Sequence, residues 1–225
     1  MIPLSDYAGF RKRFPIITVG LVAVNVLVFI YQLSLPQRTL VAFIQSYGAV
    51  PYELARGVDV PPFGPNPIYV TVFTSMFMHG GWLHIGSNML YLWVFGDNVE
   101  DSMGHPKYFV FYLVCGVAAV AAQTFVDVSS RIPSVGASGA IAGVLGAYIF
   151  LHPQARVKVL VILGIFITVT ELPSLIVIGF WALTQIFTGL ASLGVVTHQT
   201  GGVAYFAHIG GFFAGLFLAP IFGRR

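Results

Sequence analysis

Charged residues are scarce in this sequence. Asp, Glu, Lys and Arg make up only 8% of its 225 residues, whereas 57% are hydrophobic. A soluble domain normally carries about 25% charged residues, so the shortage excludes an ordinary soluble fold and favours a membrane protein. The 11 basic and 8 acidic residues leave a net charge of +3, which is too weak a basic excess to indicate nucleic-acid binding.

Cysteine is almost absent, since Cys115 is the only one. A single cysteine excludes a disulfide within the chain, and its apolar surroundings favour a small buried hydrophobic side chain. The zinc motif HExxH does not occur. His84 and Asn88 would make a poor metal pair. These absences argue against a zinc hydrolase.

Three long segments contain no charged residue: 14–37, 132–155 and 172–223. A bilayer core about 30 Å thick needs about 20 apolar helical residues to span it. The lengths of the apolar segments, and the Gly, Pro and charged residues that bound them, predict helices at 15–35, 82–103, 106–127, 137–152, 173–194 and 203–221. We therefore expect residues 1–225 to form a single all-α polytopic membrane domain with six transmembrane helices.

The basic residues orient these helices. With the N-terminus in the cytoplasm, six crossings put eight Lys and Arg residues inside and three outside, which satisfies the positive-inside tendency. The inside residues are Arg11, Lys12, Arg13, Lys107, Arg156, Lys158, Arg224 and Arg225, and the outside residues are Arg38, Arg56 and Arg131. Both termini are expected to be cytoplasmic, in a multi-pass protein of the cell membrane.

Two connections do not fit a plain bundle. Residues 36–81 form a long, proline-rich outer loop between the first and second helices, in which 70–78 is expected to lie in the membrane interface. Residues 153–172 form an inner connection whose apolar run, 157–169, is too short to span the membrane. An interfacial segment is the favoured interpretation over a seventh helix. Residues 194–202 are expected to form the turn between the last two helices.

Polar side chains inside a membrane span cost free energy, so those that occur are candidates for function. His84 and Asn88 lie four residues apart on one face of the second helix. Ser138 opens the fourth helix, and His208 lies near the start of the sixth. Because these three helices run from outside to inside, all four residues are expected about 5–10 Å below the outer end.

Small residues flank Ser138 and His208. Gly139 and Gly143 on the fourth helix, and Gly211 and Gly215 on the sixth, recur at intervals of four residues. Such rows let helix backbones approach closely. They would pack helices in any polytopic protein, but here they are expected to bring the serine and the histidine together.

Serine with histidine is a nucleophile and its base. Ser138 and His208 are therefore the candidate catalytic pair. Donors to a developing oxyanion are expected from His84, Asn88 and the backbone amides of Gly136, Ala137 and Ser138. No carboxylate lies in 132–155 or 172–223, so a dyad is expected, with packing or a neutral hydrogen bond orienting the His208 ring. A GxSxG elbow is excluded by Ala140.

These residues resemble one family closely, the rhomboid intramembrane serine proteases. The resemblance covers nearly the whole chain and is carried by four motifs in order. They are His84-x-x-x-Asn88, Gly96-x-x-x-Glu100-x-x-x-Gly104, Gly136-Ala137-Ser138-Gly139 and Ala207-His208-Ile209-Gly210-Gly211.

The resemblance implies a six-helix rhomboid-like bundle without metal or organic cofactor. It also implies cleavage of single-span transmembrane proteins near the outer face, by Ser138 as nucleophile and His208 as base, with His84 and Asn88 assisting the oxyanion. The chain departs from the family pattern in two places. Val70-Thr71 stands where some members carry a Trp-Arg pair in the outer loop, and Ala142 stands where an aromatic residue often stacks on the catalytic histidine.

Three hypotheses follow for the function. The leading one is an active protease of a prokaryotic membrane. The alternative is a proteolytically silent rhomboid-like protein that binds membrane-protein clients, against which the intact Ser138 and His208 argue. A small transporter is the third, and the absence of charged residues in the later spans argues against it.

Overall fold

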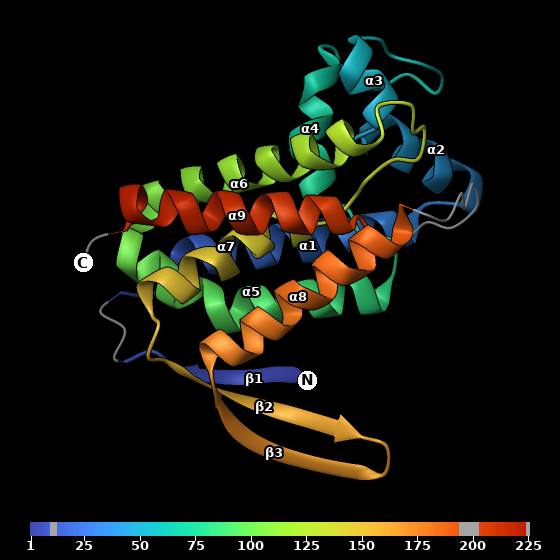
Figure 1. Cartoon of the computed structure of the whole chain (residues 1–225). Coiled ribbons are helices and arrows are strands. Elements are labelled where there is room, and N and C mark those ends of the chain that lie inside the picture. Colours follow the sequence, from blue (N-terminus) through green and yellow to red (C-terminus); the bar gives the residue numbers. More distant parts are fainter. Residues whose placement is uncertain (10–12, 194–202, 224–225) are drawn as a thin grey trace.

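The computed structural model describes residues 1–9, 13–193 and 203–223 and is built mainly from six long helices (Figure 1). These are α1 (Ile16–Ser34), α5 (Trp82–Met103), α6 (His105–Val126), α7 (Ser138–Leu151), α8 (Ser174–Ser192) and α9 (Tyr205–Phe222). Every predicted helix is present, with ends within two residues of those expected. The predicted turn at 194–202 and the basic residues at 11, 12, 224 and 225 lie outside the described residues.

Four of these helices, α1, α6, α8 and α9, are long and apolar enough to cross a membrane. The other two differ from them in composition or length. The last two turns of α5 contain Asp97, Glu100 and Asp101, and α7 has only 14 residues. The chain is thus a mostly helical, multi-pass membrane protein, and the predicted fold class is confirmed at this level.

Helix α7 is buried on all sides. Every residue from Gly139 to Tyr148 is buried, which is the pattern of a helix in the middle of a core rather than at its surface. Helices α5, α6 and α9 pack around it. A length of 14 residues corresponds to a rise of about 20 Å, so α7 is a short helix inside the bundle, and its first residue, Ser138, is half-buried.

The rows of small residues bring the α7 and α9 backbones together. A Cβ atom on Gly211 would overlap the carbonyl oxygen of Gly139, and one on Gly215 would overlap that of Gly143. A Cβ atom on Gly139 or Gly143 would in turn overlap Ala119 or Cys115 of α6. These four glycines therefore occupy the close helix contacts that their spacing predicted.

The outer connection folds into short helices against the bundle. They are α2 (Gln37–Tyr47), α3 (Pro51–Arg56), η1 (Ile68–Val70), α4 (Thr71–Thr74) and η2 (Ser75–Phe77). Met76, Met78 and His79 are buried, each 2% exposed or less. Segment α4 contacts α6, and η2 contacts α1 and α7. The later part of this connection is thus packed among the helices that surround Ser138.

A three-stranded antiparallel sheet was not predicted. Strand β1 (Ile2–Tyr7) pairs with β2 (Arg156–Leu163), which pairs with β3 (Phe166–Pro173) through a turn at Gly164. The inner connection 153–172 is therefore largely a β-hairpin and, as expected, does not form a seventh helix. A run rich in β-branched residues interrupted by glycine favours a hairpin, and Gly164 within 157–169 supplies that signal.

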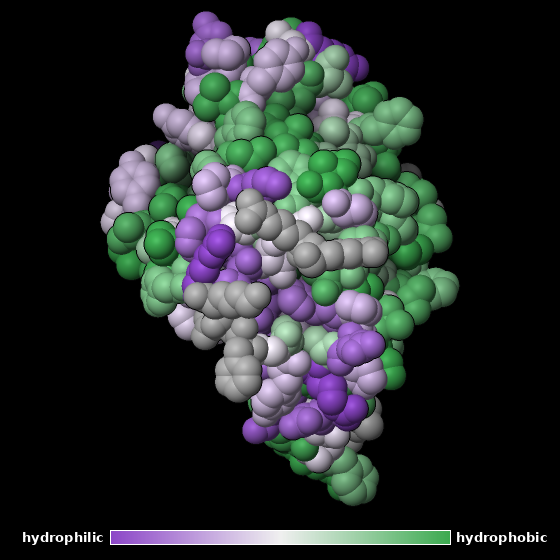
Figure 2. All heavy atoms as spheres, turned by 90° about the vertical axis from the view of Figure 1, so that its left-hand side faces the viewer, coloured by the Kyte–Doolittle hydropathy of each residue, from purple (hydrophilic) through white to green (hydrophobic). Residues whose placement is uncertain are grey.

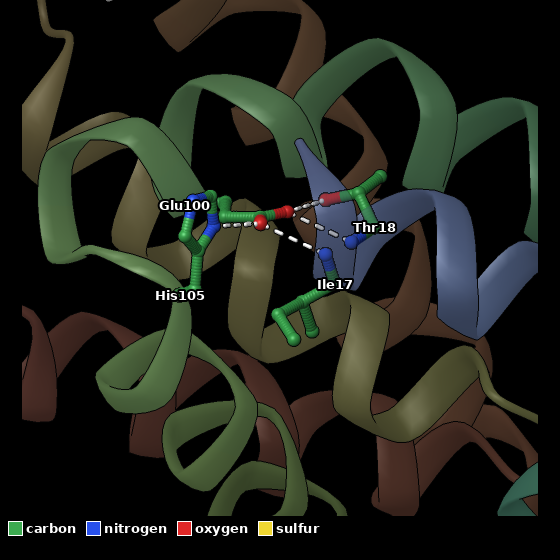
Figure 3. Close-up of polar contacts among 4 residues, drawn as sticks. All are labelled: Ile17, Thr18, Glu100 and His105. Atoms are coloured by element: carbon green, nitrogen blue, oxygen red, sulfur yellow. Dashed lines mark hydrogen bonds and ion pairs between the residues drawn. The ribbon is translucent and has the colours of Figure 1, made fainter. Parts of the chain in front are cut away.

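Glu100 joins three helices at one end of the bundle (Figure 3). Its fully buried carboxylate accepts hydrogen bonds from the backbone N–H groups of Ile17 and Thr18, at 2.9 and 2.8 Å. His105 Nδ1, at the start of α6, lies 2.5 Å from Glu100 Oε1. A carboxylate at a helix N-terminus satisfies donors that have no partner within the helix. The Gly96–Glu100–Gly104 motif thus fixes the first turn of α1.

Figure 2 shows the end of the molecule at which α9 ends. Hydrophilic side chains run from the middle of this end toward its lower part, and hydrophobic side chains lie on both sides of them. A polar end face with apolar sides is the distribution expected where a helical bundle leaves the hydrocarbon region.

Candidate active site

Ser138 and His208 meet between α7 and α9. The distance from His208 Nε2 to Ser138 Oγ is 2.7 Å, within hydrogen-bonding range. Ser138 is the first residue of α7, and His208 lies in the first turn of α9 and is only 8% exposed. The close glycine contacts between these helices explain how residues 70 positions apart come into contact.

The second ring nitrogen of His208 has its own partner. His208 Nδ1 lies 2.7 Å from Oε1 of Gln185, on α8. Trp181, one turn earlier on α8, packs on the same ring with centroids 5.8 Å apart. Sequence reasoning expected a neutral hydrogen bond or packing but named neither residue. Gln185 is a polar residue in a charge-free span, so the criterion that selected His84 and Asn88 could also have found it.

His84 lies beside the turn that precedes Ser138. Its Nδ1 accepts a hydrogen bond from the backbone N–H of Gly80 at 3.2 Å, so a neutral ring carries its proton on Nε2. Gly136 adopts φ +129°, and a Cβ there would lie 2.6 Å from His84 Nε2 and 3.6 Å from Ser138 Oγ. The His84 donor and the Ser138 hydroxyl thus flank the same glycine.

Asn88 lies one turn further along α5. Its side chain is 6% exposed, and its Nδ2 is buried without a hydrogen-bond partner in the described part of the chain. A buried amide N–H without an acceptor is costly in a folded protein. Such a donor is suited to an acceptor that arrives with a ligand.

The backbone amides before α7 divide into two groups. The N–H of Gly136 donates to the carbonyl of Ser75 at 2.8 Å, so the expectation that it would be an oxyanion donor is corrected. Ala137 and Ser138 begin the helix, where the first N–H groups have no acceptor within the helix. The small size of Gly136, rather than its N–H, is what allows His84 to approach.

His79 and Gln32 support His84 from behind. Gln32 on α1 accepts from the backbone N–H of His79 at 3.0 Å and donates to its carbonyl at 3.2 Å. The His79 ring packs edge-on against His84, with centroids 5.0 Å apart. His79 is 2% exposed and lies within the protein. Gln32 was not singled out from the sequence.

Metal ligands do not cluster here. Within residues 1–9, 13–193 and 203–223, no group of three or more His, Cys, Asp or Glu side chains is arranged to hold a metal ion. The side chains that meet at this site supply a hydroxyl, imidazole rings and amide groups.

The fold and the site define a multi-pass helical membrane protein in which the serine that begins a buried helix contacts a histidine of a neighbouring helix. A family model described as the Rhomboid domain matches residues 67–225. The chain belongs to the rhomboid family.

Three curated relatives illustrate the similarity. Rhomboid protease GluP of Bacillus subtilis is 30% identical over 230 residues, which cover 98% of this chain and 39% of the relative. The mitochondrial rhomboid protein 1 of Saccharomyces cerevisiae is 33% identical over 96 residues, which cover 41% of this chain and 28% of the relative. The human mitochondrial presenilin-associated rhomboid-like protein is 29% identical over 148 residues, which cover 63% of this chain and 34% of the relative. The chain thus matches about a third of the length of these relatives.

Proposed function

We propose that this protein is an intramembrane serine endopeptidase that cleaves transmembrane segments of single-span proteins near the outer face. The observation that carries the proposal is the 2.7 Å contact between Ser138 Oγ and His208 Nε2. The relation to a rhomboid protease of Bacillus subtilis over 98% of the chain supports it.

The reaction begins with proton transfer from Ser138 to His208. As Oγ attacks the carbonyl carbon of the scissile peptide, Nε2 takes the hydroxyl proton. The protonated ring then gives that proton to the leaving amine, and the peptide C–N bond breaks. Water then gives a proton to the same nitrogen and attacks the resulting ester, the C–Oγ bond breaks, and the protonated ring returns the proton to Oγ, which releases the carboxylate product and regenerates Ser138 and neutral His208.

Negative charge develops on the carbonyl oxygen during both attacks. Asn88 Nδ2, His84 Nε2–H and the amides of Ala137 and Ser138 are the proposed donors to it. Preorganised donors in a site with little water are among the largest contributors to catalysis. The unsatisfied Asn88 amide and the approach of His84 to Gly136 support this assignment.

The proposed location is the cell membrane of a prokaryote, with both termini in the cytoplasm and the active site opening to the opposite side. The excess of inside Lys and Arg over outside supports this orientation. In this orientation the β2–β3 hairpin, which connects α7 to α8, lies on the cytoplasmic side of the membrane. Its exposed Ile165, Phe166 and Ile167 suit contact with the lipid interface.

The experiment uses purified protein in detergent or lipid vesicles with a single-span reporter. Ser138→Ala should reduce cleavage to background, and a serine-directed fluorophosphonate should label only chains with both Ser138 and His208. Ser192→Ala is the matched control, because that hydroxyl bonds to Gly189 of its own helix, and its activity should equal the parent's. Undiminished cleavage by Ser138→Ala would overturn the proposal, and a parent without cleavage or labelling would favour a silent client-binding protein.

A further inference from the structure

His208 must be in one particular tautomer to act on Ser138. Nε2 accepts the serine proton only if it is unprotonated, so the proton of the neutral ring must be on Nδ1. An acceptor at Nδ1 selects this tautomer and fixes the ring plane. No Asp or Glu lies in residues 172–223, and the group at hydrogen-bonding distance from Nδ1 is the Gln185 side chain, at 2.7 Å.

The neighbours of Gln185 decide which end of its amide faces the ring. Thr184 donates its hydroxyl proton to the carbonyl of Trp181, at 2.6 Å. Its oxygen is then the acceptor for the Gln185 NH₂ group, 3.2 Å away. With the NH₂ group directed to Thr184, the carbonyl oxygen Oε1 faces His208 and can only accept.

The His208 ring is confined on other sides as well. Trp181 packs against it, and Nε2 contacts Ser138. Ala142 stands where the rhomboid pattern often has an aromatic residue stacked on the histidine. It is fully buried, and its methyl group is too small to hold the ring. Apart from the Ser138 contact at Nε2, the restraint on the ring comes from Gln185 and Trp181 of α8.

We propose that Gln185 is the positioning residue for the catalytic base, a neutral third member of a Ser138–His208–Gln185 arrangement. The inference rests on the proposed proteolytic function. A neutral amide orients the ring and selects its tautomer as a carboxylate would, but it adds no negative charge to stabilise the imidazolium that forms during the reaction. A Ser–His–Gln site therefore needs no buried carboxylate in this charge-free part of the membrane domain.

The test compares Gln185→Leu and Gln185→Glu with the parent protein, using the single-span reporter. Leucine removes the acceptor at similar size, and kcat should fall about 10²-fold, at the lower end of the range of general acid–base effects, while KM changes little. Glutamate keeps the acceptor and should restore most of kcat. Because an added negative charge favours the protonated ring, glutamate should also move the acid limb of the pH–rate profile to higher pH.

Gln123→Leu is the matched control. Gln123 also bonds to α9, but through the backbone N–H of Ala207 at 3.3 Å rather than the His208 ring. Its kcat and pH profile should stay close to the parent's. Thermal unfolding of each variant in detergent separates a folding defect from a catalytic one.

The outcomes separate two failures. If Ser138→Ala is inactive but folded Gln185→Leu matches the parent in kcat, the role of Gln185 is wrong and the proposed protease stands. If Ser138→Ala cleaves normally, the proposed function itself fails. Should Gln185→Leu not fold, an unshifted acid limb in Gln185→Glu would still overturn the inference.

Discussion

Glu100 and Thr18 are 82 residues apart in the chain but share two hydrogen bonds. Oε2 of Glu100 accepts from the Thr18 backbone N–H at 2.8 Å and from its hydroxyl at 2.7 Å. A residue of α5 therefore acts as the N-terminal cap of α1, whose own preceding residue, Pro15, provides no side-chain cap. The stability of α1 in the bundle depends on this contact.

Glu100→Ala is expected to destabilise the protein strongly. The change leaves the N–H groups of Ile17 and Thr18 without their acceptor, and each lost buried partner costs about 1–3 kcal/mol. The thermal unfolding temperature in detergent measures the effect. Glu171→Ala is the control, because Glu171 is about half exposed and its 3.8 Å ion pair with Arg156 lies at the surface. Equal unfolding temperatures for the two variants would contradict the capping role.

Asn88→Ala is expected to lower kcat by about 10²–10³-fold, the loss typical of one oxyanion donor. The folded protein should be no less stable, because the buried Nδ2 has no partner among the described residues that the change would leave unpaired. Kinetics with the reporter and thermal unfolding are measured on the same sample. An unchanged kcat would remove Asn88 from the oxyanion site, and a large drop in stability would assign it a structural role.

Gly136→Ala is expected to abolish cleavage while the chain still folds into the membrane. Alanine is disfavoured at φ +129°, and its Cβ would lie 2.6 Å from His84 Nε2. The fluorophosphonate labelling rate reports on Ser138 directly and should fall with cleavage. Gly179→Ala, where an added Cβ meets nothing within 4 Å, should leave both rates unchanged. Parent-like labelling of Gly136→Ala would show that His84 need not approach Gly136.

Gly215→Ala tests the α7–α9 contact away from the site. The new Cβ would overlap the carbonyl oxygen of Gly143, so the helices must separate, and overpacking of this kind costs about 1–3 kcal/mol. A lower unfolding temperature is expected, together with lower activity, since Ser138 and His208 lie on these two helices. Gly86→Ala has open space around its Cβ and serves as the control. No change relative to Gly86→Ala would mean that the helices tolerate a wider spacing.

The sequence was most informative where the membrane restricts it. Apolar runs bounded by glycine, proline and charge predicted all six helices, because every backbone group of a span must bond within its own segment. Ser138, His208 and the small residues around them were found because polar groups are expensive at that depth.

The features that were missed depend on contacts between distant segments. The sheet requires β1 at the N-terminus to pair with β2 about 150 residues later, as in the register of Asp6 with Val157, and no local periodicity encodes that pairing. Gln185 and Gln32 act through neighbours that only the folded chain supplies. The hydrogen bond from the Gly136 N–H to the carbonyl of Ser75 likewise forms because the outer connection folds back against the start of α7.

If Ser138, His208 and Gln185 act as proposed, the position of Gln185 on α8 determines how cleavage would be lost. Ser138, His208 and Gln185 belong to three different helices, and each helix can keep its internal hydrogen bonds when its neighbours shift. A mild detergent or an altered lipid that loosens α8 would release the ring of the base while circular dichroism still reports full helicity. For the proposed protease, cleavage thus depends on how the helices assemble, and reporter cleavage is a more sensitive measure of lateral helix packing than secondary structure.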